Sequence, residues 1–451
     1  MGINKSIFRE YDIRGVVGKD LDEQSVYLIG RAYGSFIKRK NLKNCVIGGD
    51  ARISTPRFKD AFIKGLLNCG IDVIDIGSVA TPVLYFSIWK LKTDGGVMIT
   101  ASHNPAEYNG IKMNIGLSSV FGKDIQLILD IILSEDFENG EGRLSTVDSI
   151  DAEYMQYIEN GIHLERPVKV IVDAGNGAGG PYLPKILRNL GCEVKEMYCE
   201  PDGNFPNHHP DPTVKKYMTD LINEMKKGEY EVGLGLDGDA DRIGVIDDTG
   251  ELLYGDQILT ILARDFLAAN PGEKIIADVK CSKNFYDDVE KHGGIPIMFK
   301  TGHANIKTKM QNENIKFAGE MSGHIFMADR YLGYDDAIYA CCRFVEIMSK
   351  TDLPVSKFLS DQPKMYNTPE IHIETTDQEK FNIVSRVRDS FRAEGYNIND
   401  IDGMRITFED GWALCRASNT TPKLVLRFEA TTPERLEEIQ KLVVDRVNEL
   451  I

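Results

Sequence analysis

Short apolar runs alternate with helical patterns over most of the chain. Nine such runs begin at Cys45, Ile71, Gly96, Val168, Cys192, Glu231, Lys274, Gly294 and Ile315. Apolar runs of this kind, separated by helical stretches, are typical of strands in parallel α/β layers. The pattern therefore predicts an α/β fold in which each group of three strands forms one module.

A weak internal repeat supports the division into modules. A helical stretch ends in glycine and leads into a strand at 66–77, 187–198 and 289–299. The copies lie on the order of a hundred residues apart, which is a typical domain size. We expect three similar α/β/α domains with mixed or parallel sheets.

The pattern changes after Pro363. Strand-like segments at 370–376, 404–411, 412–418 and 423–431 surround a helical stretch at 378–394, and a last helix begins at Pro433. Consecutive strands joined by short turns indicate an antiparallel sheet with helices on one face. We expect a smaller α+β domain at 364–451, preceded by α/β domains at 1–149, 150–250 and 251–363.

Composition narrows the functional classes. The chain has 451 residues, of which 42% are hydrophobic, and a formal net charge of -16. Nucleic acids and membrane surfaces are themselves anionic, so this charge argues against both as partners. No apolar run approaches the ~20 residues of a membrane span, and the eight cysteines form no C-x-x-C pair. The sequence thus predicts a cytoplasmic protein with reduced thiols.

The stretch ITASHNPAEYNGIKM at 99–113 is the first candidate for chemistry. Ser102 follows a strand, and strand ends in open α/β sheets are where ligands collect. His103 and Asn104 next to it can position or polarise the serine oxygen. A proline and an Asn-Gly pair disfavour regular structure, so we expect an exposed loop. A turn that only caps the next element is the alternative.

A second candidate lies in LGLDGDADRIGVIDDTG at 234–250. Asp237, Asp239 and Asp241 alternate, so a tight loop can turn three carboxylates toward one point. Three such charges need a cation or exposure to water, and oxygen ligands favour Mg²⁺, Mn²⁺ or Ca²⁺ over zinc. An EF-hand is rejected, because its required Gly and Glu positions hold Arg242 and Asp248. An arginine beside a cation suits a phosphate ester and points to phosphoryl chemistry.

A glycine-rich turn, DAGNGAGG at 173–180, suggests a competing function. It follows a strand, precedes a helix and fits the dinucleotide fingerprint G-x-G-x-x-G. Glu193 or Glu196 lies near the position of a ribose-binding acid. A nicotinamide-dependent dehydrogenase would carry such a turn. Since nothing else in the sequence supplies a hydride-transfer site, a tightly packed strand-to-helix turn is the favoured interpretation.

Further segments carry polar groups that suit a sugar phosphate. Glu320 and Ser322 stand two apart in GEMSGH, KTGHANIK contributes His303, and Lys280 follows another strand. In the tail, RASNTTP gathers one cation with hydroxyl and amide donors on a strand-ending turn, which could hold a phosphate without metal. Its members are Arg416, Ser418, Asn419 and Thr420.

Taken together, these motifs resemble those of the α-D-phosphohexomutases. TASHNP, DGDADR, GEMSGH and RASNTTP occur in the order and at the spacing of the family's four signature loops, and FREYDIRG at 8–15 is similar to a further family segment. The resemblance covers essentially the whole chain, with one motif per domain. Met321 in GEMSGH resembles the phosphomannomutase/phosphoglucomutase branch, whereas phosphoglucosamine mutases usually show Gln there.

The resemblance implies a role for each candidate residue. Ser102 would be the phosphoserine that carries the transferred group. One Mg²⁺ per active site would be held by Ser102, Asp237, Asp239 and Asp241. The other catalytic residues, near the phosphoserine, would be Arg14, His103 and Lys112. The substrate-binding residues would be Arg242, Lys280, His303, Glu320, Ser322, His324, Arg416, Ser418, Asn419 and Thr420.

The implied enzyme is an intramolecular phosphotransferase. It would interconvert the 1- and 6-phosphates of mannose, glucose or both, through a 1,6-bisphosphate that turns end over end, with glucose 1,6-bisphosphate as activator. Its partners would be hexose phosphates, and it would be a monomer or small homo-oligomer with a mobile fourth domain that closes over the labile phosphoserine. The alternatives are a phosphoglucosamine mutase and a sugar-phosphate-binding protein without turnover, although a binder needs neither Ser102 nor the aspartates.

Overall fold

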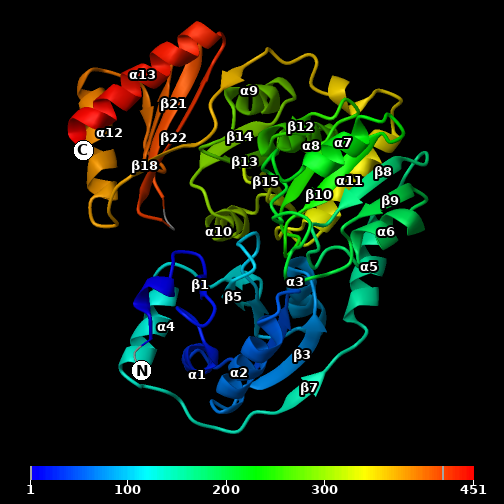
Figure 1. Ribbon diagram of the computed structural model, residues 1–451, viewed down its shortest axis with the longest axis vertical. Coiled ribbons are helices and arrows are strands. Elements are labelled where there is room, and N and C mark those ends of the chain that lie inside the picture. Colours follow the sequence, from blue (N-terminus) through cyan, green and yellow to red (C-terminus); the bar gives the residue numbers. More distant parts are fainter. Residues whose placement is uncertain (1–2, 419–420) are drawn as a thin grey trace.

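The computed structural model describes residues 3–418 and 421–451, which form four sheets that follow one another along the chain (Figure 1). In Figure 1 the first sheet lies at the bottom, the second at the right, the third near the upper centre, and the fourth at the upper left. The first three sheets mix parallel and antiparallel pairs, and the fourth is antiparallel throughout. The expected fold class is confirmed.

The first domain is a mixed sheet flanked by helices. Its elements are η1 (Lys5–Ile7), β1 (Ile13–Val16), α1 (Glu23–Lys38), β2 (Asn44–Gly49), α2 (Thr55–Leu67), β3 (Asp72–Ser78), α3 (Thr81–Leu91), β4 (Gly95–Ile99), β5 (Tyr108–Ile115), β6 (Ser118–Ser119), α4 (Lys123–Leu133) and β7 (Leu144–Thr146). The strand order is β1-β5-β4-β2-β3-β7, with β6 paired to β5. The parallel strands β2, β3 and β4 are those that the apolar runs predict.

The next two domains repeat the plan with smaller sheets. The second contains α5 (Ile150–Gly161), β8 (Lys169–Asp173), α6 (Leu183–Asn189), β9 (Glu193–Met197), α7 (Thr219–Met225), β10 (Val232–Leu236), β11 (Ile243–Ile246) and β12 (Leu252–Leu253). The third contains α8 (Gly255–Ala269), β13 (Lys274–Asp278), α9 (Lys283–Lys291), β14 (Ile295–Phe299), α10 (His303–Glu313), β15 (Phe317–Gly319), β16 (Ile325–Met327) and α11 (Ala337–Ser349). Their strand orders are β12-β11-β10-β8-β9 and β14-β13-β15-β16.

The fourth domain is the predicted α+β unit. It follows η2 (Val355–Lys357) and contains β17 (Tyr366–Asn367), β18 (Ile371–Glu374), α12 (Lys380–Ala393), β19 (Ile398–Asn399), β20 (Met404–Thr407), β21 (Gly411–Ala417), β22 (Lys423–Ala430) and α13 (Pro433–Leu450). The sheet order is β17-β22-β21-β20-β19, with β18 also paired to β22. Figure 1 shows α12 and α13 together on one side of this sheet.

The segment after Ser102 differs from the expected exposed loop. β5 begins at Tyr108 and pairs antiparallel with β4, and Asn109 and Gly110 are buried within it. The Asn109 side chain donates a hydrogen bond of 2.8 Å to Ser54 Oγ, so its amide is satisfied inside the sheet. The irregular loop is limited to 100–107, and Ser102 is only 2% exposed. The prediction of a loop at Asn109-Gly110 was wrong because the hydrogen bond of the Asn109 side chain offsets the weak strand propensity of this pair.

Apolar packing joins the first three domains to one another more extensively than it joins the fourth domain to them. One continuous cluster of buried apolar side chains runs through domains one to three, whereas the fourth has its own core around α12 and α13. A small cluster of Val279, Trp412 and Leu414 links the fourth domain to the third, where Arg405 also donates to the Cys281 carbonyl at 2.8 Å. Among the described helices, none is both long and apolar enough to cross a membrane.

Candidate active site

A cavity of about 630 Å³ lies where the four domains meet. This volume falls in the usual range of small-molecule sites. The residues predicted for the site that line it are Arg14, Ser102, His103, Lys112, Arg242, Lys280, His303, Glu320, Ser322, His324, Arg416 and Ser418. Asn419 and Thr420 lie outside the described residues. Four loops that are far apart in the sequence thus converge on one space.

Ser102 sits at one end of this cavity in a strained backbone conformation. Its φ of 50° places it in the left-handed region, which costs a residue with a side chain ~1–3 kcal/mol and is concentrated at functional sites. The hydroxyl donates to Asp237 Oδ2 at 2.7 Å, and His103 Nδ1 lies 3.2 Å from the same oxygen. The serine oxygen therefore stands between a carboxylate and an imidazole.

The three aspartates of the loop between β10 and β11 lie directly behind Ser102. Asp237, Asp239 and Asp241 are fully buried, and one oxygen from each falls within 4.8 Å of the others. Asp237 Oδ1 accepts from the backbone N–H groups of Asp241 and Arg242 at 3.0 and 3.1 Å, so the loop itself orients this carboxylate. The predicted convergence of the three carboxylates is thus present.

Lys112 on β5 balances part of this negative charge. Its Nζ lies 2.7 Å from Asp239 Oδ2 and 2.6 Å from Asp241 Oδ2. Burial alone would lower the pKa of Lys112, but the two carboxylates outweigh it and raise that pKa well above its usual range. Burial, together with Asp241 and Asp239, also raises the pKa of Asp237 well above its usual range. One ammonium is therefore not enough for three carboxylates.

The remaining donor atoms fit a divalent cation. Within the described residues, Asp239 Oδ1 and Asp241 Oδ1 are buried and have no hydrogen-bond partner. An all-oxygen set of this kind suits hard cations such as Mg²⁺. A cation there would also relieve the repulsion that raises the pKa of Asp237. The residues present fit such an ion.

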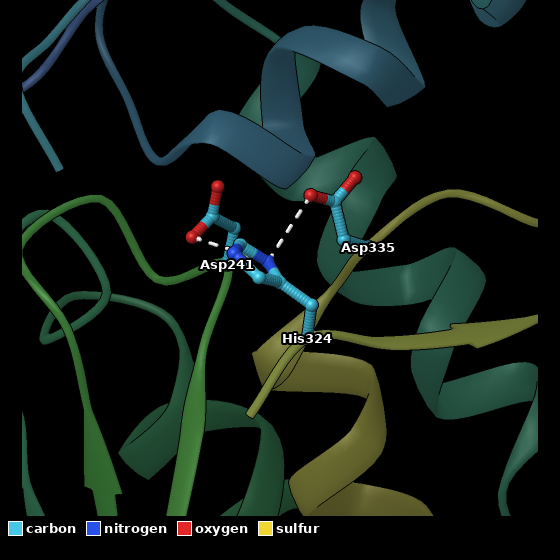
Figure 2. Close-up of side chains that lie close together, drawn as sticks. All are labelled: Asp241, His324 and Asp335. Atoms are coloured by element: carbon cyan, nitrogen blue, oxygen red, sulfur yellow. Dashed lines mark ion pairs between the residues drawn. The ribbon is translucent and has the colours of Figure 1, made fainter. Parts of the chain in front are cut away.

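A second buried cluster adjoins the aspartates. Figure 2 shows His324 between Asp241 and Asp335, with Nδ1 lying 3.6 Å from Asp241 Oδ1 and 3.3 Å from Asp335 Oδ2. Arg242 Nε donates to His324 Nε2 at 3.1 Å, so the ring proton of a neutral His324 sits on Nδ1 and faces the carboxylates. Asp335 Oδ2 also lies 3.3 Å from His303 Nδ1, so this carboxylate lies beside both histidines.

The middle of the cavity carries a buried acid. Glu320 Oε1 accepts from the Gly302 N–H at 2.7 Å, and burial raises the pKa of Glu320. Its other oxygen is buried without a partner among the described residues. Ser322 lines the cavity two positions further along. A carboxylate and a hydroxyl placed in this way can read the hydroxyl groups of a polar ligand.

Part of the cavity is cationic. Arg416 Nη2 donates to Thr301 Oγ1 at 2.8 Å and Arg416 Nε to Asp402 Oδ2 at 3.1 Å. Lys280 Nζ lies 3.2 Å from Glu370 Oε1, and this ammonium lowers the pKa of Glu370 to about 2. Two cations, one from the third and one from the fourth domain, thus line the same cavity as Ser102 and can bind an anionic group.

Several cavity residues escaped the sequence analysis. Three of them stand in FREYDIRG beside Arg14, so that motif could have revealed them; three more lie in KTGHANIK and in the strand-like segment at 370–376, where nothing marked them as cavity residues. They are Arg9, Tyr11 and Asp12, followed by Thr301, Glu370 and His372, and the cavity lining includes further residues such as Tyr108 and Thr421. Asp335, which lies beside two histidines, was missed as well, because the sequence does not show what a carboxylate contacts.

The glycine-rich turn at 173–180 lies outside this cavity. The Ala178 N–H donates to the Gly238 carbonyl at 2.9 Å, so the turn packs against the aspartate loop. Glu193 lies 3.5 Å from Lys169, and Glu196 pairs with Arg188. The structure supports a strand-to-helix turn at this position. Among the described residues, neither Glu193 nor Glu196 is placed as the ribose-binding acid that the dehydrogenase hypothesis requires.

Comparisons with known proteins agree with this geometry. Family models described as the three alpha/beta/alpha domains and the C-terminal domain of phosphoglucomutase/phosphomannomutase match residues 5–139, 152–250, 254–366 and 370–446. The chain is 44% identical over 436 residues to the phosphomannomutase/phosphoglucomutase of Pseudomonas putida, covering 96% of this chain and 94% of that protein. It is 44% identical over 442 residues to the phosphoglucomutase of Neisseria meningitidis, covering 97% and 96%.

A solved structure is similar over the same length. The phosphoglucomutase/phosphomannomutase family protein from Burkholderia thailandensis superposes with a TM-score of 0.94 at 38% identity, covering 100% of this chain and 98% of that one. Fold, converging loops and full-length similarity lead to the same conclusion: the chain belongs to the phosphoglucomutase/phosphomannomutase family.

Proposed function

We propose that the protein is a phosphohexomutase that interconverts hexose 1-phosphate and hexose 6-phosphate, of mannose, glucose or both, through a phosphoserine at Ser102 and a hexose 1,6-bisphosphate. One observation carries the proposal: a single cavity holds Ser102 against three buried aspartates and is also lined by two cations. A serine beside a set of carboxylates that can hold a cation, together with two cationic side chains and a hydroxyl-reading carboxylate in one cavity, suits a sugar that carries phosphate at either end. The names of the full-length relatives support the same reaction.

The transfer step breaks the bond from Ser102 Oγ to phosphorus while the substrate O6 forms its own bond to that phosphorus. The hydroxyl proton of O6 passes to His103, which is neutral because burial, with help from Arg242, lowers its pKa well below its usual range. Lys112 and Arg14 offset negative charge beside the transferring group. One Mg²⁺ held by Ser102, Asp237, Asp239 and Asp241 would, when bound, neutralise charge on the phosphoryl oxygens.

The other cavity residues hold the sugar phosphate. Lys280, Arg416 and Ser418 bind the phosphate that is not being transferred, together with Asn419 and Thr420, while Glu320 and Ser322 bind the sugar hydroxyls. The remaining ligands are His303, Arg242 and His324. After the first transfer the bisphosphate turns over and returns its 1-phosphate to Ser102. Glucose 1,6-bisphosphate activates the enzyme because it can rephosphorylate the serine.

We further propose the domain division 1–149, 150–250, 251–363 and 364–451, with the fourth domain moving to admit substrate. The separate apolar core of the fourth domain supports this mobility. A cytoplasmic location is proposed on the eight cysteines, which are all free thiols in the structure. For the oligomeric state we propose a monomer or a small homo-oligomer.

A coupled assay with Mg²⁺ and a trace of glucose 1,6-bisphosphate tests the proposed reaction. Glucose 1-phosphate and mannose 1-phosphate are followed separately, with Ser102→Ala as the control. We expect turnover of both sugars, since glucose and mannose differ only at C2, and loss of both in the variant. Turnover of glucosamine phosphate alone would favour the phosphoglucosamine mutase, and turnover of no sugar by a protein phosphorylated at Ser102 would favour the silent binder.

A further inference from the structure

The loop that carries Ser102 is held from behind by one buried arginine. Arg52 is 1% exposed and does not line the cavity. Its Nη1 donates to the carbonyls of Pro105 and Tyr108 at 2.6 and 3.0 Å. Its Nη2 donates to the carbonyls of Ser102 and Asn104 at 2.8 and 2.6 Å. One guanidinium thus anchors the loop from Ser102 to the start of β5.

A second chain of hydrogen bonds joins the same arginine to the amide of Ser102. Arg52 Nε donates to Asp50 Oδ2 at 3.1 Å, and this oxygen also accepts from Thr100 Oγ1 at 2.7 Å. Thr100 Oγ1 in turn accepts from the Ser102 N–H at 2.9 Å. All five N–H donors of the guanidinium therefore have partners, and both the N–H and the carbonyl of Ser102 are tied to the same network.

The second domain packs on the other side of this arginine. The ring of Phe205 lies 5.0 Å from Arg52 Cζ. A Cβ at Gly203 would lie 2.4 Å from the Ala51 carbonyl oxygen and 2.7 Å from Arg52 Cα, so only glycine permits this approach. The second domain also carries the three aspartates that Ser102 faces. Arg52 therefore lies between the serine loop and the second domain.

Stability alone gives no reason for this arrangement. Burying a guanidinium is costly even when it is paired, and well-packed apolar side chains often stabilise a fold as well or better. The planar guanidinium instead fixes the positions of several carbonyl groups at once. The left-handed conformation of Ser102 needs such support, because strained backbone persists only where its surroundings determine it fully.

We propose that Arg52 is a positioning residue for phosphoryl transfer, which holds the Ser102 backbone so that Oγ faces Asp237 and the substrate. The inference rests on the proposed function of Ser102. Arg52 has no contact with the cavity, so its loss should slow the transfer step and leave substrate binding nearly unchanged. This separation of rate from binding is what a test can measure.

The test compares Arg52→Gln with a matched control, Arg57→Gln. Arg57 lies five residues further on, is 52% exposed and pairs with Glu23 at 2.8 Å. We expect the first variant to lose about 100-fold in kcat, the usual effect of a small misplacement of a reacting group, with KM for glucose 1-phosphate changed less than about threefold. The control should match the wild type in both constants.

Two further variants keep the test decisive if Arg52→Gln folds poorly. Arg52→Lys keeps the charge beside Asp50 but has one nitrogen for four carbonyls, so kcat should stay low. Thr100→Val removes the hydrogen bonds of Thr100 Oγ1 to the Ser102 N–H and to Asp50 Oδ2 and leaves the four carbonyl contacts of Arg52 in place. About a tenfold loss in kcat at constant KM is expected, since the Ser102 N–H loses its hydrogen bond. Thermal midpoints are recorded for all of them.

Wild-type kcat in Arg52→Gln or Arg52→Lys would overturn the inference. So would losses in Thr100→Val that fall on KM and thermal midpoint together, because a merely structural role would show that pattern. An inactive wild-type protein would instead refute the proposed function, so the two failures are distinguishable.

Discussion

At the scale of single residues, charge balance decides what the site can do. Three buried carboxylates lie beside one ammonium, that of Lys112. Burial, together with the like charges of Asp241 and Asp239, raises the pKa of Asp237 well above its usual range. The alternating aspartates could be predicted from the sequence because they are neighbours. Their pairing with a lysine 127 residues away from Asp239 could not, since nothing in the pattern near Lys112 marks it.

Asp237→Asn should separate stability from activity. Burial and two like charges disfavour the ionised carboxylate, so neutralising it should raise the thermal midpoint measured in EDTA at pH 7. Mutase activity in Mg²⁺ should fall on the order of 1000-fold, because the cation supplies several kcal/mol of transition-state stabilisation. Mg²⁺ should raise the midpoint of the wild type and have little effect on the variant. An equal response of both proteins to Mg²⁺ would contradict a cation site at Asp237.

At the scale of elements, the sequence predicts regular strands well and their exceptions poorly. The nine apolar runs all form strands. In central strands such as β4 and β10, which are buried along their whole length, burial on both faces leaves a continuous hydrophobic signal. β1 and β5 gave no such signal: β1 is short and carries Arg14, and β5 contains Asn109, Gly110 and Lys112. In these two strands, polar residues of the site interrupt the pattern that identifies a strand, so two elements that bear the chemistry were missed.

Gly238→Ala tests how closely the aspartate loop must approach the serine loop. A Cβ at position 238 would lie 2.4 Å from the Ser102 carbonyl oxygen, so one of the two loops must shift. We expect kcat to fall about 100-fold, as for other displacements of a reacting group. Gly161→Ala, where an added Cβ has no atom within 4 Å among those described, serves as the control. Unchanged kcat in Gly238→Ala would show that the close approach is not required.

At the scale of the whole molecule, the site exists only because four domains meet. Sequence order and spacing showed which loops belong together through the resemblance, but not which side chains touch across domains. Glu370 is the example: its partner Lys280 lies ninety residues earlier, in the third domain. The junction between these domains combines a small apolar cluster with ion pairs and hydrogen bonds, which suits a unit that opens and closes.

Substrate should close this junction. If the fourth domain moves, glucose 1-phosphate should slow cleavage of the segment near Pro363 in limited proteolysis. Sodium chloride at the same ionic strength should not slow it. A phosphate bound by Lys280 and Arg416, as proposed above, would bridge the third and fourth domains and so favour a closed arrangement. Equal rates of cleavage with and without the sugar phosphate would count against a mobile fourth domain.

The Lys280–Glu370 pair should also make the junction sensitive to acid. Because the folded-state pKa of Glu370 is lowered to about 2, its contribution to stability is complete above the ordinary glutamate pKa of about 4.3 and is lost as pH falls toward 2. Thermal midpoints below about pH 4.5 should therefore fall less steeply in Glu370→Gln than in the wild type. Glu374→Gln, at a side chain that is 73% exposed, is the control. Parallel curves for all three proteins would contradict the pairing.

The most direct test of the account asks whether Ser102 carries the transferred group. Dephosphorylated protein is incubated with Mg²⁺ and glucose 1,6-bisphosphate labelled in its phosphates, and the labelled peptide is identified by mass spectrometry. We expect one label per chain at Ser102 and none in Ser102→Ala. When glucose 1-phosphate is added, the label should leave Ser102 as labelled glucose 1,6-bisphosphate, and it should reach glucose 6-phosphate once the 1-phosphate of that bisphosphate has returned to Ser102. A label at another residue, or turnover without any labelled protein, would contradict the account.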